Sequence, residues 1–345
     1  MRTSNQTEEN FVVNVGPKAR QKVKAKIARR VRPEPQPVFA ETDPLEELDK
    51  TVVENIQVPN RTMTPVPRFG GKGNFVKRIL PHIPWSKVYC EPYCGAASIF
   101  WNLKPRPVEV LNDIDEELIT LFRCIQNPET FRELRHKLLW TPYSRAEYCK
   151  AFKMSNIASL VDKAWAVFVK YNQAMNALPN SLAAWSRVFI SKRGMADVCN
   201  SWRGHLRLLE MWHDRLTRVQ LDDRDALEVI QYWDSPETFF YIDPPYIADT
   251  RKSKKIYNHE TTDDHHQKLV SLLLKIRGGV VVSGYKHEIY APLDEAGWKR
   301  YEFEAHCHIP QTRIAAIPDK NKRREQTRRT EILWVKPFPA NKMLF

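Results

Sequence analysis

The sequence predicts an α/β protein with a mainly helical segment inserted into its sheet. From residue 61 onward, short apolar runs bounded by turn residues alternate with segments of helical periodicity. Between residues 128 and 216 the apolar residues recur at helical spacing, and Trp and Arg are frequent. Five apolar runs are expected to form strands: 87–90, 108–112, 238–242, 279–283 and 331–335.

Residues 1–60 differ in composition from the rest of the chain. Eight basic and no acidic residues lie between Lys18 and Arg32, whereas seven acidic residues and one basic residue, Lys50, lie between Glu34 and Glu54. Blocks of like charge with few aromatic residues predict a disordered tail. The basic block is either a solvated segment or an arm that tethers DNA, and composition does not choose between them.

The overall charge favours a polyanionic partner. The chain has 54 Lys and Arg against 41 Asp and Glu, a net charge of +13. Six cysteines are scattered through apolar stretches without a secretory leader, so we expect a reducing cytoplasm and no disulfides. No apolar stretch reaches the roughly 18 residues of a membrane span. The Cys and His residues lack structural zinc spacing, so no metal is expected.

The sharpest local feature is an apolar strand, 239–242, that ends at Asp243-Pro244-Pro245-Tyr246. Ligands of open α/β sheets bind at the carboxyl ends of strands. Proline fixes φ and donates no backbone hydrogen, so carbonyls near the Asp243 carboxylate can accept bonds from a ligand. Two acceptors and an aromatic ring suit an amino group on a planar ring, with Asp243 and the Pro244 carbonyl accepting its hydrogens and Tyr246 stacking on the ring.

Taken alone, the tetrapeptide could equally be a strand-to-turn junction, because Asp and Pro are ordinary turn residues. It nevertheless resembles the catalytic loop of the amino-methyltransferases, and the Asp form is typical of enzymes that act on adenine in DNA. The resemblance implies catalytic roles for Asp243, Pro244, Pro245 and Tyr246. It also implies S-adenosyl-L-methionine as the methyl donor.

A second motif, Glu91-Pro92-Tyr93-Cys94-Gly95, follows the apolar run at 88–90. Small residues in such a turn let the backbone approach a ligand closely. The motif resembles the first cofactor motif of the same family, usually Glu-Pro-Phe-x-Gly-x-Gly-Ser. This implies that Glu91, Pro92, Tyr93 and Gly95 bind the methionine part of the cofactor, and Ala97 stands where a second glycine is usual.

Two acidic residues are candidates for the nucleoside part of the cofactor. Asp113 follows the run 108–112, where an acid in a nucleoside-binding fold accepts hydrogen bonds from ribose hydroxyls. The alternative role for Asp113 is to cap the following helix. Asp225, with Ala226 beside it, precedes Asp243 by 18 residues, where the family places an acid that contacts the adenine amino group. Asp223 is the alternative to Asp225.

The resemblance extends beyond these motifs, from about residue 67 to residue 337. Phe69-Gly70-Gly71-Lys72 resembles the motif that opens the catalytic domain, which implies that Phe69 and Lys72 contact the cofactor or the catalytic loop. Segments containing Arg251 and Tyr257 resemble those of phage and prophage members, and these two residues are expected to bind DNA. The order of cofactor motifs, insertion and catalytic motif is similar to that of Dam-type N6-adenine-specific DNA methyltransferases.

The insertion at 128–216 is therefore the expected target-recognition region. Arg can bond guanine bidentately, while Lys and Ser mostly hold phosphate. Each basic residue could instead belong to a solvated cationic face, and the basic cluster at 320–329 is either a phosphate clamp or an aid to solubility. The candidates for DNA binding in the insertion are Trp185, Arg187, Lys192, Arg193, Trp202 and Arg203.

These features together predict a Rossmann-like S-adenosylmethionine-dependent methyltransferase sheet at 61–127 and 217–345, interrupted by the target-recognition subdomain. The expected reaction is site-specific methylation of the N6 amino group of adenine, flipped out of double-stranded DNA. We expect a cytoplasmic monomer or weak dimer from a bacterium or phage, with a role in restriction-modification or DNA marking. The alternatives are an amino-methyltransferase on RNA or cytosine, and a non-catalytic DNA-binding relative.

Overall fold

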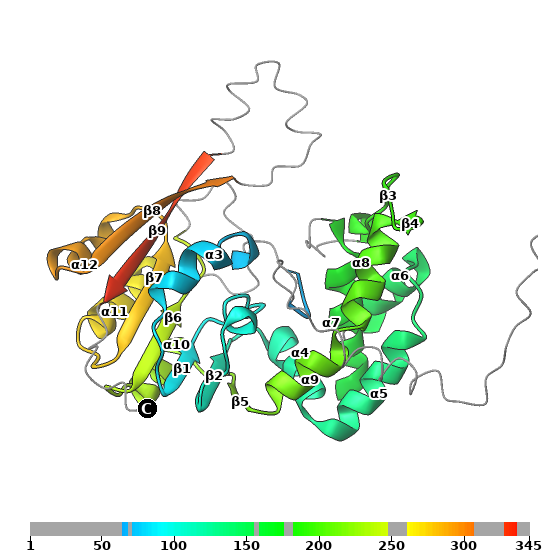
Figure 1. Cartoon of the computed structure of the whole chain (residues 1–345), viewed down its shortest axis with the longest axis horizontal. Coiled ribbons are helices and arrows are strands. Elements are labelled where there is room, and N and C mark those ends of the chain that lie inside the picture. Colours follow the sequence, from blue (N-terminus) through cyan, green and yellow to red (C-terminus); the bar gives the residue numbers. More distant parts are fainter. Residues whose placement is uncertain are drawn as a thin grey trace, which may run out of the picture. The chain divides into compact units, whose positions relative to one another are not determined.

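The computed structural model describes residues 64–67, 71–154, 159–175, 182–247, 261–306 and 328–336. The tail predicted at 1–60 and most of the basic cluster at 320–329 lie outside these residues. The fold is built on a seven-stranded sheet of order β5-β2-β1-β6-β7-β9-β8 (Figure 1). Its strands are β1 (Val88–Glu91), β2 (Val108–Asn112), β5 (Val219–Asp222), β6 (Thr238–Ile242), β7 (Gly279–Gly284), β8 (Lys299–His306) and β9 (Arg328–Lys336).

The first five strands of this order run parallel, and β9 and β8 are antiparallel to their neighbours. Central parallel strands are buried on both faces, so they appear in the sequence as continuous apolar runs. This is why β1, β2, β6 and β7 form where the apolar runs predict them. β9 is antiparallel, but its residues 331–334 are also buried because the strand lies between β7 and β8. All residues of β6 and β7 are buried.

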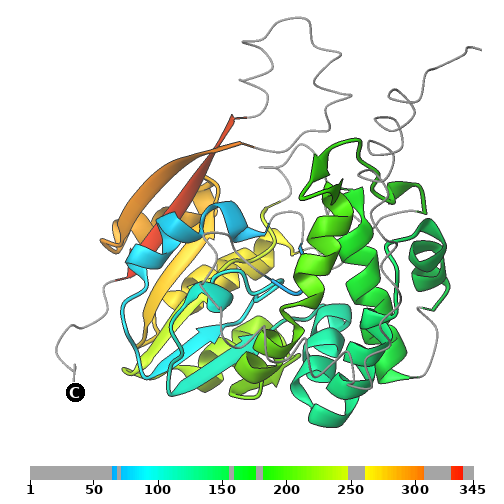
Figure 2. The ribbon, with the colours of Figure 1, turned by 45° about the vertical axis from the view of Figure 1, so that its right-hand side comes forward.

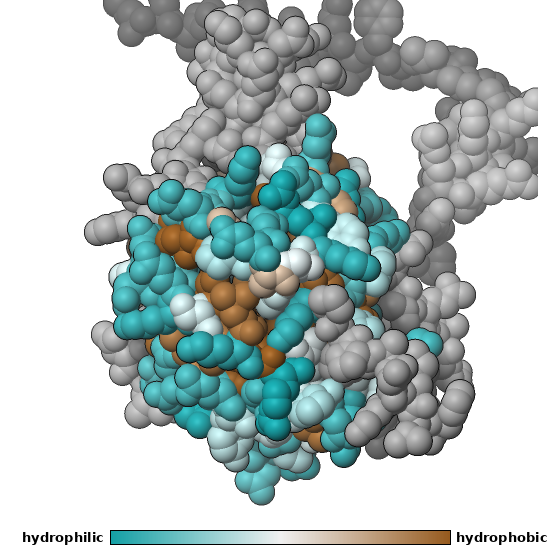
Figure 3. All heavy atoms as spheres, turned by 90° about the vertical axis from the view of Figure 1, so that its left-hand side faces the viewer, coloured by the Kyte–Doolittle hydropathy of each residue, from teal (hydrophilic) through white to brown (hydrophobic). Residues whose placement is uncertain are grey.

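Two edge strands, β5 and β8, were not predicted. β5 is four residues long and contains the exposed Gln220, so it lacks a continuous apolar run. In β8, exposed Arg300, Glu302 and Glu304 alternate with the half-buried Tyr301 and Phe303. Charged side chains on an edge strand discourage pairing with another chain. Figure 3 shows the face that carries β8 and the helix α12 (Ala291–Glu295), where hydrophilic side chains surround smaller apolar patches.

Helices cover both faces of the sheet. Val229 of α10, Leu269 of α11 and Leu293 of α12 pack in one core with strand residues such as Phe240 and Val282. On the other face, α3 and α4 pack in a second core against the neighbouring strand residues, among them Phe239 and Val281. Successive strand residues point to opposite faces, so adjacent residues enter different cores. These helices are α3 (Val76–Ile79), α4 (Glu116–Gln126), α10 (Ala226–Trp233), α11 (Asp263–Leu273) and α12 (Ala291–Glu295).

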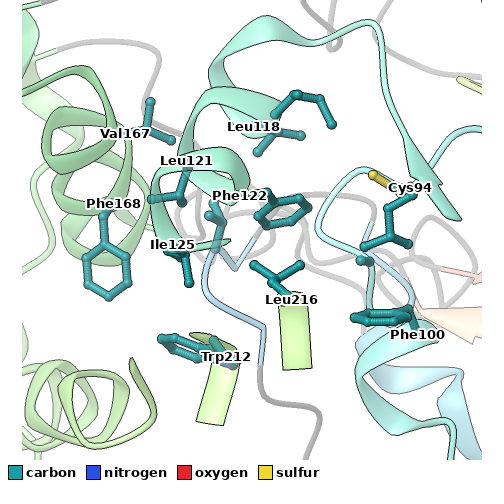
Figure 4. Packing of buried hydrophobic residues seen from close by; sticks show 14 of the residues in the cluster. Cys94, Phe100, Leu118, Leu121, Phe122, Ile125, Val167, Phe168, Trp212 and Leu216 are labelled. Carbon is teal, nitrogen blue, oxygen red and sulfur yellow. The ribbon is translucent and has the colours of Figure 1, made fainter. Parts of the chain in front are cut away.

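Between α4 and β5 the chain is mainly helical, as predicted. It forms α5 (Pro128–Leu139), α6 (Arg145–Lys153), α7 (Leu160–Gln173), the two-stranded hairpin β3 (Ser191–Lys192) and β4 (Met195–Ala196), α8 (Asp197–Leu206) and α9 (Leu209–Leu216). Figure 2 shows these helices grouped beside the sheet. The core of the second face continues into this group through Leu121 and Phe122 of α4, Phe168 of α7 and Trp212 of α9 (Figure 4).

Side-chain caps set the beginnings of several helices. Asp115, Asn127, Ser144, Ser159, Asp225 and Thr262 each accept a hydrogen bond from a backbone N–H in the first turn of the following helix. Such caps satisfy N–H groups that have no partner inside the helix. Asp115, and not Asp113, is therefore the cap of α4. No helix in the described part of the chain is long and apolar enough to cross a membrane.

Candidate active site

A cavity lies at the edge of the sheet where β1, β2 and β6 end. Because these strands are parallel neighbours, the residues that follow them meet at one edge. The cavity brings together all but one of the described residues predicted for the cofactor and the catalytic loop. Its lining includes Lys72, Glu91, Pro92, Tyr93, Gly95, Asp113, Asp225, Ala226, Asp243, Pro244 and Pro245. Tyr246 lies outside the lining, and Phe69 lies outside the described residues.

The turn after β1 is shaped by two residues in the left-handed region. Gly95 has φ of 50° and Ala97 has φ of 52°. The second value explains why glycine is usual at the position of Ala97, since a Cβ is disfavoured at positive φ. The Gly95 N–H donates to Oδ2 of Asp113 over 2.7 Å, and the Asp115 N–H donates to Oδ1 over 2.9 Å. Asp113 thus joins the turns that follow β1 and β2.

Asn112 ties the same region to the turn after β5. Its Nδ2 donates to the Pro92 carbonyl over 2.8 Å and to the Arg224 carbonyl over 3.1 Å, while its Oδ1 accepts from the Arg224 N–H over 3.0 Å. This side chain is completely buried. Asp225 follows Arg224 in the chain. Its carboxylate caps α10 by accepting a hydrogen bond from the Leu227 N–H, and it also lines the cavity. The acids assigned to the nucleoside are therefore held in place by backbone contacts.

Glu91 is a buried acid in the cavity wall. Its side chain accepts a hydrogen bond of 2.6 Å from the Tyr89 hydroxyl, and the residue is 1% exposed. Burial raises the pKa of Glu91 to about 8, against the opposing effect of the Tyr89 bond. Glu91 is therefore mostly protonated at neutral pH in this structure.

The carboxylate of Asp243 is held by two donors on the same oxygen. Nζ of Lys72 donates to Oδ1 over 2.6 Å, and the Ser283 hydroxyl donates to Oδ1 over 2.9 Å. Ser283 in turn lies 3.3 Å from the hydroxyl of Tyr241. Burial would lower the pKa of Lys72, but attraction to Asp243 and Glu331 outweighs it and holds this pKa well above its usual range. Lys72 therefore remains a cation.

The side chain of Tyr246, the last residue of the catalytic loop, is buried outside the cavity lining. Its hydroxyl donates to Glu331 of β9, its ring lies 4.5 Å from that of Tyr285 between centroids, and Nζ of Lys72 lies 4.6 Å from its ring centroid. Burial, together with the negative charges of Glu331 and Asp243, raises the pKa of Tyr246 well above its usual range. The hydroxyl therefore stays protonated and acts as a donor.

A second chain of hydrogen bonds reaches the loop from α11. The Thr261 hydroxyl donates to the Pro245 carbonyl over 2.9 Å and lies 2.9 Å from Nε2 of His266, whose Nδ1 lies 2.9 Å from the Tyr290 hydroxyl. These distances fit a neutral imidazole that donates through Nε2 and accepts through Nδ1. Burial lowers the pKa of His266 to about 4, with His265 adding to the effect. His266 thus links the loop to α11 as an uncharged group.

The predicted DNA-binding residues of the insertion lie in two kinds of environment. Arg187, Lys192, Arg193 and Arg203 are exposed, and the hairpin turn has Arg193 at φ of 54° and Gly194 at φ of 78°. Positive φ at both central residues is typical of a tight hairpin turn. Trp185 is half-buried, with Nε1 donating to Gln173 over 3.3 Å. Arg251 and Tyr257 lie outside the described residues.

Trp202 corrects one sequence-based prediction. It is 4% exposed, its Nε1 donates to the Thr141 carbonyl over 3.2 Å, and its ring packs on Phe168 with centroids 5.6 Å apart. Successive residues on a helix point about 100° apart, so Trp202 can enter the core while the adjacent Arg203 faces solvent. The ring of Trp202 is therefore a packing element and is not available to DNA.

The match to a protein family is consistent with this cavity. Residues 69–294 match the family described as D12 class N6 adenine-specific DNA methyltransferase. The chain belongs to this family. The matched residues include both motifs that flank the cavity, and the Rossmann-like sheet agrees with the predicted methyltransferase fold. The protein is an adenine-specific DNA methyltransferase.

Comparisons with individual proteins add little to this assignment. No protein among those with curated descriptions matches the sequence of this methyltransferase. One solved structure that it matches is the "putative RNA methyltransferase PH1948 from Pyrococcus horikoshii". The identity is 10%, the match covers 84% of this chain and 96% of that one, and the TM-score is 0.34. So distant a likeness carries no argument about function.

Two residues of the methyltransferase site were not predicted as part of it. Glu331 and Thr261 both contact the catalytic loop. Ser283, in the segment 280–285 that the resemblance places beside the target-base pocket, contacts Asp243, and His265 lines the cavity. Phe189, 102% exposed beside the hairpin, was also missed, although a fully exposed aromatic ring next to basic residues suits nucleic-acid contact.

Proposed function

We propose that this methyltransferase transfers the methyl group of S-adenosyl-L-methionine to the N6 amino group of adenine in double-stranded DNA, within a specific sequence. The observation that carries the proposal is the anchoring of Asp243 at the cavity wall. Lys72 and Ser283 both bind Oδ1, so Oδ2 is the oxygen that we assign to the substrate amino group. A carboxylate fixed before the substrate arrives needs no reorganisation during the reaction.

The residues around the cavity fit the cofactor. A Cβ built on Gly95 would meet no atom within 4 Å, so the backbone here is open to a close ligand. Carboxylates in the lining, among them Asp113 and Asp225, suit hydroxyl and amino groups as hydrogen-bond acceptors. We assign Glu91, Pro92, Tyr93 and Gly95 to the methionine part, Asp113 to the ribose, and Asp225 with Ala226 to the adenine. When bound, S-adenosylmethionine supplies an electrophilic methyl group.

The catalytic loop acts on the adenine amino group. Oδ2 of Asp243 and the carbonyl of Pro244 accept its two hydrogens, which localises the nitrogen lone pair toward the methyl carbon. Attack by this nitrogen on the methyl carbon of the bound donor would break the sulfur–carbon bond and release the neutral thioether, and the surplus proton of the methylated nitrogen would pass to solvent. Lys72 holds the Asp243 carboxylate in place for this acceptor role, and the loop contributes orientation rather than a covalent intermediate.

The adenine must leave the duplex to reach this loop. Extruding one base costs a few kcal/mol in typical cases, which contacts to the neighbouring DNA offset. We assign these contacts to the target-recognition segment 128–216, where Arg187, Lys192, Arg193 and Arg203 are exposed around the hairpin. Phe189 offers a ring that can stack on a base. The enzyme is expected to act as a monomer or weak dimer in the cytoplasm.

Transfer of labelled methyl groups from S-adenosylmethionine to unmethylated duplex DNA tests this proposal. We expect N6-methyladenine as the product, and Asp243→Ala should lower the rate by about 10²–10³-fold, the usual effect of removing one preorganised hydrogen-bonding group. Asp264→Ala is the matched control, because this acid on α11 is 68% exposed and pairs only with Lys268 among the ion pairs of the described chain. Methylation of cytosine or of RNA alone would assign another substrate.

A further inference from the structure

Three charged side chains form a buried cluster behind the catalytic loop. Nζ of Lys72 lies 2.6 Å from Oδ1 of Asp243 and 3.4 Å from Oε1 of Glu331. The side chains of Lys72 and Glu331 are only 5% and 4% exposed, compared with 19% for Asp243. One ammonium is thus shared by two carboxylates, and the ionised cluster has an excess of one negative charge.

The three groups differ in their access to the cavity. Lys72 and Asp243 line it, whereas Glu331 is not part of its lining among the described residues. Glu331 lies on β9, where it also accepts the hydrogen bond from Tyr246. A ligand in the cavity therefore meets Asp243 and Lys72 directly, whereas Glu331 contributes its charge from outside the lining.

A cationic ligand and Lys72 would compete for Asp243. The point rests on the proposed function, because sulfur is positively charged in S-adenosylmethionine and neutral in the product, S-adenosylhomocysteine. With Glu331 as a second partner, the Lys72 ammonium can shift away from the cavity while staying paired. Asp243 then remains available to attract the cationic sulfur and to accept the adenine amino group. Without Glu331, Lys72 would neutralise Asp243 by itself.

We propose that Glu331 is a specificity-determining residue, which makes the cavity favour the cationic methyl donor over its neutral product by acting as the second counter-ion of Lys72. The preference is electrostatic and depends on the charge of the cluster rather than on its shape. A unit charge several ångströms away in a protein of effective dielectric about 20 changes affinity by about tenfold or more. The neutral product should be much less sensitive to the same change.

Binding of S-adenosylmethionine and S-adenosylhomocysteine, measured by titration calorimetry on the full-length protein, tests the proposal. Glu331→Gln removes the charge and keeps the shape, so it should lower the preference for the cationic donor by about tenfold. The double variant Lys72→Met with Glu331→Gln restores the excess of one negative charge, so its preference should return toward that of the wild type. Glu237→Gln is the control, since it removes one negative charge from an exposed ion pair outside the cavity lining.

The outcomes separate this inference from the proposed function. If the wild type binds neither compound, the cofactor assignment fails and the inference fails with it. If the wild type binds both, but Glu331→Gln weakens them equally or the double variant shows no recovery, Glu331 has only a structural role and the inference alone is overturned. Thermal unfolding of each variant establishes that the compared proteins are folded.

Discussion

The hydroxyl of Tyr93 lies 2.7 Å from Nε2 of His265, and this hydrogen bond joins the turn after β1 to the first turn of α11. The two rings meet edge to face, with centroids 6.0 Å apart. Both residues line the cavity, and Asp225 lines it as well. Two segments that are 172 residues apart in the sequence thus form one wall of the proposed cofactor site.

His265→Ala should weaken cofactor binding without unfolding the protein. The variant leaves the Tyr93 hydroxyl without its partner, and the net value of one such hydrogen bond is about 0.5–1.5 kcal/mol, equivalent to roughly 2–10-fold in affinity. Calorimetric titration with S-adenosylmethionine measures the change. Lys268→Ala on the same helix, where the side chain is 64% exposed, is the control. Equal affinity of His265→Ala and the wild type would show that the pair does not shape the site.

Glu91 should release a proton when the cofactor binds. Burial raises the pKa of Glu91 to about 8, and a cationic ligand in the cavity would favour its ionised form. Binding near pH 7 should therefore release up to about one proton, and affinity should rise as the pH increases toward 8. Calorimetry in buffers of different ionisation enthalpy measures the release. Glu91→Gln should abolish it, and an equal release by this variant would assign the proton to another group.

The same pKa has a consequence for stability. A carboxyl group whose pKa is raised by folding stabilises the protein fully below its ordinary pKa of 4.5, and this contribution is lost as the pH rises through about 8. Glu91→Gln should therefore unfold at a denaturant concentration that changes less between pH 5 and pH 8 than that of the wild type. A variant curve parallel to that of the wild type over this range would contradict the assignment.

His266 should lower the free energy of unfolding at acidic pH, whereas the contribution of Glu91 is lost at alkaline pH. The pKa of His266 is lowered from 6.5 to about 4, so its contribution to stability is present above pH 6.5 and is lost as the pH falls toward 4. The shift corresponds to a loss on the order of 3 kcal/mol. His266→Gln cannot titrate, so its unfolding free energy should fall less between pH 6.5 and pH 4.5. Identical pH dependence in both proteins would mean that other groups dominate acid unfolding.

The sequence alone predicts those strands that are encoded by a run of consecutive apolar residues. Parallel strands that are buried on both faces, such as β6 and β7, appear as continuous apolar runs. Edge strands do not, because β5 and β8 each keep polar side chains toward solvent. Motif residues at the ends of predicted strands, such as Glu91 and Asp243, could be placed together because parallel strands end at one edge.

Contacts between distant segments were beyond the reach of the sequence. Glu331 is 85 residues from Tyr246, and Lys72 is 171 residues from Asp243. Nothing in the local pattern around Glu331 indicates that its carboxylate turns inward on β9. The prediction that Trp202 contacts DNA was wrong for a related reason. Its basic neighbour Arg203 suggested a surface position, but the helix directs the indole of Trp202 into the core.

Substitutions around the hairpin should separate DNA contacts from packing residues. Lys192→Ala should weaken DNA binding about equally on all sequences and reduce the dependence of log affinity on log salt by about one unit, because one phosphate contact is lost. Phe189→Ala should also weaken DNA binding and leave stability unchanged, since the ring is fully exposed. Fluorescence anisotropy with duplex DNA at several salt concentrations gives both quantities, and Lys87→Ala, 54% exposed beside the first strand, is the control.

Trp202→Ala should give the opposite pattern. Loss of a buried Trp side chain typically costs about 3–5 kcal/mol of stability, since it removes apolar contacts and leaves a cavity. The protein that remains folded should bind DNA with the salt dependence of the wild type, because the indole packs on Phe168 rather than on a ligand. Chemical unfolding and anisotropy on the same preparation distinguish the two effects. A Trp202→Ala protein of wild-type stability that binds DNA weakly would restore this residue to the interface.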